Sequence, residues 1–309
     1  MNCEQLFQEG GPFFHLHTLP LETDLLFRTP DQMNLALNMT ALAICESDCR
    51  LLAFAIMNNH LHFILEGKEK NCLGFYDRFQ HRLAKSYRLE HRFSLAMAAQ
   101  PSLVGISNLK QLRDEIIYVI RNPFVVDPRV HVFAYPWTSG YLYFNPMLED
   151  SLQGGVPAEK LSVRQRREFK RERNAEVDNR ILIRNGVALP ASFTDYRRAM
   201  SFFENARQYI YWTLKNVEAQ VSIANRMGEL ANLDDMELWN VAVRLCKDHY
   251  KVSFPKELGK EQLVQFLTTM KYQYHASNAQ LARCFRIPLS DINAYFPLSA
   301  KQTVPASTL

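Results

Sequence analysis

Apolar residues in the N-terminal part of the chain follow two alternating patterns. Short runs of β-branched and aromatic residues, typical of strands, alternate with segments whose apolar residues recur every three or four positions, as on a helix. Segment 74–91 shows the helical pattern, with Phe75, Phe79 and Leu83 at intervals of four. The predicted elements are a strand at 13–19, a helix at 31–47, a strand at 51–65, a helix at 74–91, a strand at 102–106 and a helix at 108–121. This alternation predicts an α+β fold with a mostly antiparallel sheet.

The strand predicted at 51–65 carries two histidines, His60 and His62, in an otherwise apolar run. Side chains two positions apart project from the same face of a strand, so the two imidazoles lie side by side. Burying them costs free energy unless both find partners. They are either core histidines that bond to backbone carbonyls or ligands of one divalent metal ion. A second pair, His15 and His17, has the same spacing, so spacing alone does not decide.

Four segments of the chain resemble sequence motifs of one protein family, and they occur in the same order along the chain as in that family. Segment 57–65 reads MNNHLHFIL and is similar to the metal-binding strand of the single-tyrosine HUH transposases (IS200-like), more narrowly of the REP-associated tyrosine transposases. Segment 118–123 reads YVIRNP and resembles the family's nucleophile helix, which ends in Tyr-x-x-x-Asn-Pro. YPWTSGY at 135–141 is similar to the Trp-Ser-Ser-Tyr that closes the catalytic domain, and GGPFF at 10–14 is similar to its opening. The resemblance spans roughly residues 10–145.

The resemblance implies a fold, a site and a reaction. The fold is a ferredoxin-like antiparallel sheet with helices on one face, the HUH nuclease domain. In it, His60, His62 and the amide oxygen of Asn122 hold one divalent ion, Mg²⁺ or Mn²⁺. Tyr118 attacks a phosphodiester of single-stranded or hairpin DNA and forms a 5′-phosphotyrosine intermediate. After the helix, the family's NPVRAG is replaced by NPFVVD at 122–127.

Tyr118 has alternatives as the nucleophile. It is four positions before Asn122, so the two share one face of the predicted helix. A tyrosine in the run IIYVI also suits a helix packed into a core. Three other tyrosines are rival nucleophiles: Tyr135, Tyr141 and Tyr143. Only Tyr118 is followed by Asn and Pro four and five positions later, which favours it.

Charge permits a nucleic-acid partner without requiring one. The 309 residues carry a formal net charge of +4. Basic residues gather on the helix at 74–91, where most of the charges suit an ordinary amphipathic helix, and on a charged helix predicted at 164–173. That second helix is either solvated, with Arg–Glu pairs, or a phosphate-binding segment beside the site. The DNA-binding candidates are Arg78, Arg82, Arg166, Arg167, Lys170 and Arg171.

Cysteine usage and hydropathy predict the compartment. Six scattered cysteines without a Cys-x-x-Cys pair favour a reducing environment. The sequence shows no N-terminal signal pattern and no apolar run near the ~20 residues of a membrane span. We therefore expect a cytoplasmic protein without a membrane partner, and the resemblance favours a monomer.

The chain is long enough for more than one domain. We expect an HUH single-tyrosine nuclease domain at 1–150, a basic linker and helix at 151–190, and a helical domain at 191–309. Segment 278–296 reads as a short helix, a turn and a second helix capped by Ser290. This is the outline of a helix-turn-helix, whose second helix would enter the major groove of DNA.

Three functions are compatible with these residues. The leading one is a metal-dependent DNA endonuclease and strand transferase that uses Tyr118. The second is a non-catalytic DNA-binding regulator that reads DNA through 278–296. The third is a metal phosphoesterase that uses the histidine pair and a water nucleophile, with Tyr118 structural. A covalent protein–DNA adduct distinguishes the first from the other two.

Overall fold

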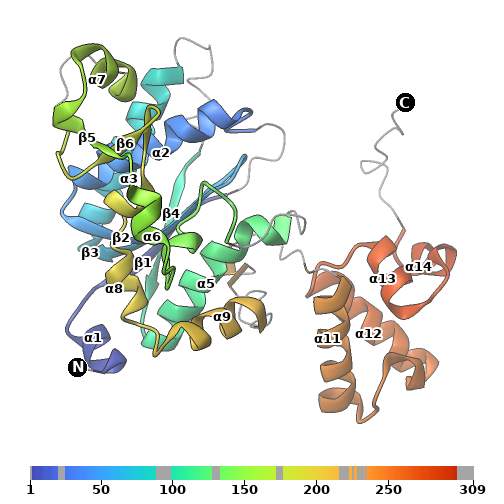
Figure 1. The fold of residues 1–309 in the computed structure, drawn as a ribbon. Helices are drawn as coiled ribbons and strands as arrows, with labels where there is room; N and C mark the ends of the chain where they lie inside the picture. The colour runs from blue at the N-terminus through green and yellow to red at the C-terminus, as the bar shows by residue number, and fades with distance from the viewer. Residues whose placement is uncertain are drawn as a thin grey trace. The chain divides into compact units, whose positions relative to one another are not determined.

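The chain forms two compact units in a computed structural model (Figure 1). Unit 1 comprises Met1–Asn216 and Arg226–Glu229, and unit 2 comprises Val217–Asn225 and Leu230–Leu309. Unit 1 extends past the boundaries predicted at 150 and 190. The structure describes residues 2–19, 25–87, 99–126, 133–171, 177–215, 223–224, 226–227, 233 and 235–297.

Unit 1 is built on a four-stranded antiparallel sheet with the strand order β2-β3-β1-β4. Its strands are β1 (Phe13–Thr18), β2 (Cys49–Ile56), β3 (Leu61–Gly67) and β4 (Pro101–Ile106). The α+β class and the antiparallel sheet are therefore confirmed. The single strand predicted at 51–65 is wrong, because β2 and β3 form a hairpin. The chain turns at Asn58 and Asn59, a residue type favoured in turns, and Met57 N–H donates to His60 O at 2.9 Å.

Two helices connect the strands and cover one face of the sheet. Helix α2 (Pro30–Cys45) lies between β1 and β2, and α3 (Glu69–Tyr87) lies between β3 and β4. Thr29 caps α2 by accepting from Gln32 N at 3.3 Å, with proline at the first turn. Phe63 of β3 packs against two aromatic rings of α3, with centroid distances of 5.1 Å to Phe75 and 5.8 Å to Phe79. The last four residues of the helix predicted at 74–91 lie outside the described residues.

The opposite face of the sheet is covered by α5 (Leu109–Val126), which packs against β2 and β3 (Figure 1). Helices therefore lie on both faces, not on one. The end predicted for this helix at 121 is also wrong, because α5 continues through Pro123 to Val126. Proline removes one backbone donor and disfavours the preceding helical residue. Ile116, Ile117 and Ile120 of this helix are fully buried, and the burial of these apolar side chains offsets the cost.

The predicted linker at 151–190 contains a second, three-stranded sheet, β5-β6-β7. Asn38 of α2 anchors it: Nδ2 donates to Gly186 O and Oδ1 accepts from Ala188 N, both at 2.8 Å. The charged helix α7 is shorter than predicted, since Arg171 adopts a left-handed conformation (φ 53°). The other elements of unit 1 are α1 (Cys3–Gln8), η2 (Gly140–Leu142), α6 (Leu148–Leu152), β5 (Val156–Pro157), η3 (Ala158–Lys160), α7 (Val163–Lys170), β6 (Leu182–Arg184), β7 (Val187–Ala188), η4 (Pro190–Ser192), α8 (Tyr196–Met200) and α9 (Ala206–Lys215).

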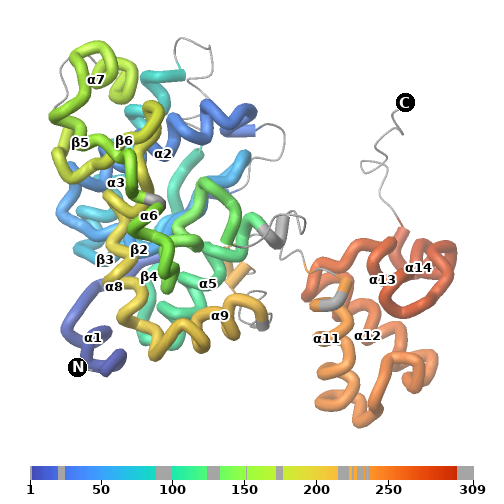
Figure 2. The backbone as a smooth tube through the Cα atoms, viewed as in Figure 1, coloured from blue at the N-terminus to red at the C-terminus, as the bar shows by residue number. Residues whose placement is uncertain are grey.

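Every element that the structure describes in unit 2 is helical. Helices α13 (Asn278–Phe285) and α14 (Leu289–Tyr295) form the predicted helix–turn–helix path, which Figure 2 follows along the backbone. Ser277 caps α13, whereas α14 begins after Pro288 without a side-chain cap, so the predicted Ser290 cap is wrong. The remaining elements are α11 (Asp235–Leu245), η5 (Cys246–Tyr250), η6 (Pro255–Glu257) and α12 (Lys260–Tyr272).

The helices in the part of the chain that the structure describes are too short or too polar to cross a membrane.

Candidate active site

The pairing of β1 with β3 gathers four histidines on one sheet face. His17 lies directly opposite His62 in the antiparallel register, and His15 lies opposite Ile64. Directly opposed residues project from the same face, and each strand alternates its faces. His15, His17 and His62 therefore share the face beneath α5. The intervening Leu16 and Phe63 belong to the core on the other face. His60, just before β3, completes the group, which we call the histidine cluster.

Asn122 of α5 lies between the rings of His60 and His62. Its Oδ1 is 3.1 Å from His60 Nε2, and its Nδ2 is 3.1 Å from His62 Nε2. The two ring centroids are 4.9 Å apart, with perpendicular planes. All three side chains are buried. The structure therefore brings together at one point the three side chains predicted to bind a metal ion.

The Nδ1 atoms of His60 and His62 have partners other than Asn122. His60 Nδ1 lies 2.7 Å from Asn59 Oδ1, and His62 Nδ1 lies 3.0 Å from His15 Nε2. Histidines that bind a metal through Nε2 usually donate Nδ1–H to such an acceptor. Both rings therefore have the orientation that metal binding through Nε2 requires. Two imidazole nitrogens and one amide oxygen suit a divalent ion such as Mn²⁺ or Mg²⁺.

The third protein ligand at such a site would have to be an amide. Among the residues that the structure describes, no group of three or more His, Cys, Asp or Glu side chains could hold a metal ion. The candidate set contains only two of these, His60 and His62, and relies on Asn122 for its oxygen. An amide oxygen is a neutral ligand, so the set itself adds no negative charge.

Tyr118 lies one helical turn before Asn122, on the same side of α5. Its ring contacts that of His62 edge to face, with centroids 5.6 Å apart and planes at 87°. The ring centroids of Tyr118 and His15 are 6.1 Å apart. All four residues predicted for the chemistry therefore lie together, from two separate segments of the chain.

Two of the rival tyrosines have structural partners in β2. Tyr143 Oη donates to Leu52 O at 2.5 Å, and Tyr135 Oη donates to Ile56 O at 3.0 Å. Burial raises the pKa of both hydroxyls above the ordinary value. Burial also raises the pKa of Tyr141 to about 12, against a lowering by Arg184. These interactions tie the 135–143 segment to the sheet edge.

Trp137, Thr138 and Ser139 of the same segment pair with the outer strand β2. Thr138 pairs with Ala55 in an isolated bridge, and Ser139 N–H donates to Phe54 O at 3.0 Å. Trp137 O accepts from Ile56 N at 2.9 Å. These bonds satisfy polar groups of the outer strand β2, which a bare sheet edge would leave unpaired. In this structure, the segment that resembles Trp-Ser-Ser-Tyr therefore covers the sheet edge.

His15 of the histidine cluster and its partner Glu115 were not predicted as site residues. His15 Nδ1 lies 2.8 Å from Glu115 Oε2, and both side chains are fully buried. Arg226 forms an ion pair with Oε1 of the same carboxylate. The sequence held two signals for them. His15 repeats the His-x-His spacing, and Glu115 lies three positions before Tyr118, on the same helix face.

The predicted DNA-binding residues lie on the opposite side of the sheet. Arg78 and Arg82 belong to α3, and α7, which carries Arg166, Arg167 and Lys170, packs against α2. Arg82 is paired with Glu46 at 2.7 Å, and Lys170 is buried. Arg171 follows α7 and is exposed. The alternative that the α7 segment lies beside the site is therefore wrong, while DNA binding by these residues stays a prediction.

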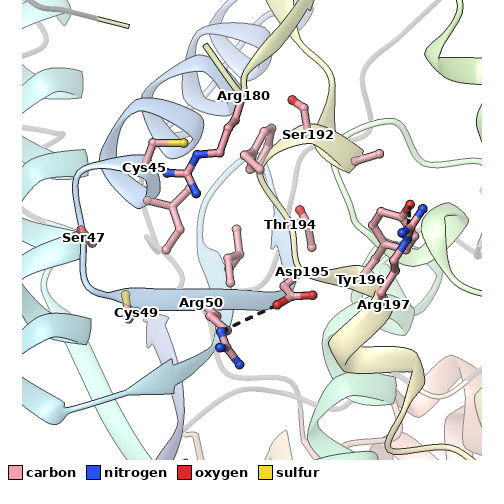
Figure 3. A pocket seen from close by; sticks show the side chains of 14 residues that line it. Cys45, Ser47, Cys49, Arg50, Arg180, Ser192, Thr194, Asp195, Tyr196 and Arg197 are labelled. Carbon is pink, nitrogen blue, oxygen red and sulfur yellow. Dashed lines mark hydrogen bonds and ion pairs between the residues drawn. The ribbon is translucent and has the colours of Figure 1, made fainter. Parts of the chain in front are cut away.

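A cavity of about 460 Å³ lies elsewhere in unit 1 (Figure 3). The end of α2, the start of β2 and segment 191–197 line it, together with Arg180. Arg50 and Asp195 face each other across part of it at 3.9 Å. No residue of the histidine cluster lines this cavity. It is therefore separate from the candidate active site.

Comparisons with known proteins find one distant structural likeness. No protein-family model and no curated protein matches this chain. A solved structure described as "Structure of the REP associates tyrosine transposase bound to a REP hairpin" is 16% identical to it, with a TM-score of 0.34. The alignment covers 45% of this chain and 82% of that chain. Similarity at this level carries no argument about what this chain does.

Proposed function

We propose that unit 1 is a metal-dependent DNA endonuclease and strand transferase with Tyr118 as its nucleophile. The observation that carries the proposal is the convergence of His60 Nε2, His62 Nε2 and the Asn122 amide beside the ring of Tyr118. A core histidine pair would be satisfied by backbone carbonyls. Here an amide side chain from a distant helix lies between the two rings instead.

The order of elements agrees with the proposed class. β1-α2-β2 and β3-α3-β4 are two crossover units whose strands interleave as β2-β3-β1-β4. We assign this arrangement to the ferredoxin-like HUH nuclease domain, with α5 as the added helix that carries the nucleophile. The sequence segments at 57–65 and 118–123 support the same assignment.

In the proposed site, His60, His62 and Asn122 would hold one Mg²⁺ or Mn²⁺ ion, which would polarise and orient a phosphodiester. Tyr118 Oη forms a bond to phosphorus, and the bond from phosphorus to the 3′ oxygen of the preceding nucleotide breaks. The tyrosyl proton leaves to a base or to water, and the 3′ oxygen takes up a proton from water and is released as a hydroxyl. The 5′-phosphotyrosine retains a phosphodiester bond, so the strand can be rejoined without ATP.

The resemblance of segments 57–65 and 118–123 implies single-stranded or hairpin DNA as the substrate. Exposed basic residues such as Arg78 and Arg167 would contact phosphates further along the DNA.

We place the protein in the cytoplasm as a monomer.

Covalent trapping tests this function. The protein is incubated with single-stranded and hairpin oligonucleotides from the DNA that flanks its gene, with Mg²⁺ or Mn²⁺, and run on a denaturing gel. We expect a denaturant-resistant adduct that is lost in Tyr118→Phe and in His60→Ala/His62→Ala, but kept in Tyr135→Phe. Cleavage without an adduct, unchanged in Tyr118→Phe, would support the metal phosphoesterase instead.

A DNA-binding regulator is the second candidate, because α13 and α14 form a defined helix–turn–helix. Asn278 Nδ2 donates to Asn293 Oδ1 and to Phe296 O, both at 2.8 Å, which fixes α14 against α13. Residues Ser290, Asp291, Ala294 and Tyr295 of α14 are exposed. DNA binding that survives Tyr118→Phe but is lost on changes to this surface, with no cleavage, would support the regulator.

A further inference from the structure

We propose that Glu115 and His15 are positioning residues that set the tautomer of His62, so that His62 Nε2 presents a lone pair toward Asn122. A fully buried hydrogen-bonded chain carries this inference. It runs from Glu115 Oε2 to His15 Nδ1 (2.8 Å), and from His15 Nε2 to His62 Nδ1 (3.0 Å). It ends where His62 Nε2 lies 3.1 Å from Asn122 Nδ2.

The carboxylate determines the direction of the chain. An ionised carboxylate can only accept, so the proton between Glu115 and His15 belongs to His15 Nδ1. Neutral His15 then has a lone pair on Nε2, and its neighbour, His62 Nδ1, must donate to it. The proton of neutral His62 is thereby on Nδ1, and Nε2 carries the lone pair. Asn122 Nδ2, a donor, faces that lone pair, as this assignment requires.

The reverse chain would need one more proton, held between Glu115 and His15. Every proton would shift if Glu115 were protonated and donated to His15, leaving His62 with its proton on Nε2, where it would block a metal ion. Arg226 disfavours this alternative, because its guanidinium pairs with Oε1 of Glu115. An adjacent cation stabilises the ionised carboxylate. His15 of β1 and Arg226 are not among the proposed metal ligands, but both therefore help to set the tautomer of His62.

The consequence for an ion rests on the proposed function. His60 needs only its neighbour Asn59 to hold its Nδ1 proton, since the two are adjacent in the turn. His62 has the same need, and the group beside its Nδ1 is a side chain from another strand, His15 Nε2 at 3.0 Å. His15 supplies the acceptor, and Glu115 gives it the required tautomer. Partners of this kind commonly change metal affinity about 10–100-fold.

The first test needs no metal ion, and it uses a variant only to assign the His62 signals. Protein labelled with ¹⁵N at its nine histidines is studied by long-range ¹H–¹⁵N NMR, at a pH where the rings are neutral. His62→Gln identifies the His62 signals. We expect His62 with its proton on Nδ1 and a bare Nε2. A proton on Nε2 of His62 in the wild type overturns the inference, whatever the enzyme does with DNA.

Variants of His15 separate positioning from packing. His15→Phe keeps the ring volume but removes both nitrogens, and it should release the tautomer of His62 and raise the Kd for Mn²⁺ about 10–100-fold. His15→Gln restores a donor toward Glu115 and an acceptor toward His62, so it should recover the tautomer and most of the affinity. His81→Gln, at an exposed imidazole of α3 outside the histidine cluster, is the control. Equal effects of His81→Gln and His15→Phe would overturn the inference.

The two proposals fail in different ways. Wild-type protein with the expected His62 tautomer that binds no Mn²⁺ and forms no DNA adduct supports the positioning role and refutes the proposed function. An adduct-forming enzyme whose His62 carries its proton on Nε2 does the reverse. Thermal melting of each variant shows whether it is folded, and the wild-type NMR result stands even where a variant is not.

Discussion

Tyr118 lies edge-on against His62, with ring centroids 5.6 Å apart and planes at 87°. One residue comes from α5 and the other from β3, 56 positions earlier in the chain (118 − 62). This contact places a hydroxyl-bearing ring beside an imidazole that also faces Asn122 and His15. The reactivity proposed for Tyr118 depends on this neighbourhood, because a tyrosine hydroxyl with a pKa near 10 in water is a weak nucleophile at neutral pH.

The amide at the centre of the site should control metal affinity. Asn122→Ala removes the proposed oxygen ligand, and Asn59→Ala removes the acceptor of His60 Nδ1. We expect each change to weaken Mn²⁺ binding roughly tenfold or more, measured by titration calorimetry. Asn58→Ala is the matched control, because this neighbouring side chain is exposed. Unchanged affinity in Asn122→Ala would remove this residue from the proposed metal set.

Tyr143 should matter for stability and not for chemistry. Tyr143→Phe deletes the hydroxyl that donates to Leu52 O and leaves that buried carbonyl without this donor. The cost should be about 1–3 kcal/mol, seen as a lower melting temperature. Adduct formation by the folded variant should be unchanged. Tyr118→Phe should show the opposite pattern, and a Tyr143→Phe variant that melts normally but forms no adduct would reverse the assignment of the two tyrosines.

The ion pair of Glu66 with Arg198 should make unit 1 sensitive to acid. Burial raises the pKa of Glu66, but hydrogen bonds from Arg198 and Gly11 N–H, with the charges of Arg198 and Arg50, bring it below its ordinary value of 4.5. A carboxyl with a lowered folded-state pKa stabilises the fold above the unfolded-state value. That stabilisation is lost as the pH falls through the folded-state value. Protection of β1 and β3 amides from hydrogen exchange should therefore decline as the pH falls below about 4.5.

Two variants test the origin of this acid sensitivity. Glu66→Gln should be less stable than the wild type at neutral pH and should lose less protection on acidification. Glu168→Gln breaks the exposed pair with Arg164 and should leave the profile unchanged, since exposed ion pairs contribute little. An acid profile that is the same in Glu66→Gln as in the wild type would assign the sensitivity to other carboxyls.

Asn278 should hold the helix–turn–helix of unit 2 together. Its buried amide donates to Asn293 of α14 and to Phe296 O at the end of that helix. Asn278→Ala should destabilise the α13–α14 pair by about 1–3 kcal/mol. Hydrogen exchange in the full-length chain should become faster in α14 and should not change in β1 or β3. Uniform loss of protection in both units would contradict a local role.

The candidate residues could be predicted because their spacing and type are local properties. Two histidines at positions i and i+2 of a strand share a face whatever the fold, and Tyr118 and Asn122 share a helix face for the same geometric reason. The α+β order also follows from local hydrophobic periods. The hairpin between β2 and β3 was missed because the apolar run continues through both strands, and only the two asparagines mark the turn.

The sequence by itself determined which side chains share one face of a local segment: His60 with His62, His15 with His17, and Tyr118 with Asn122. The tertiary structure alone decided which pairs meet. Strand register sets His17 opposite His62, and the packing of α5 on that face brings Asn122 and Glu115 into the histidine cluster, while α3 and α7 carry their arginines to the other side of the sheet. Register and packing depend on long-range burial of apolar surface, which no local spacing encodes.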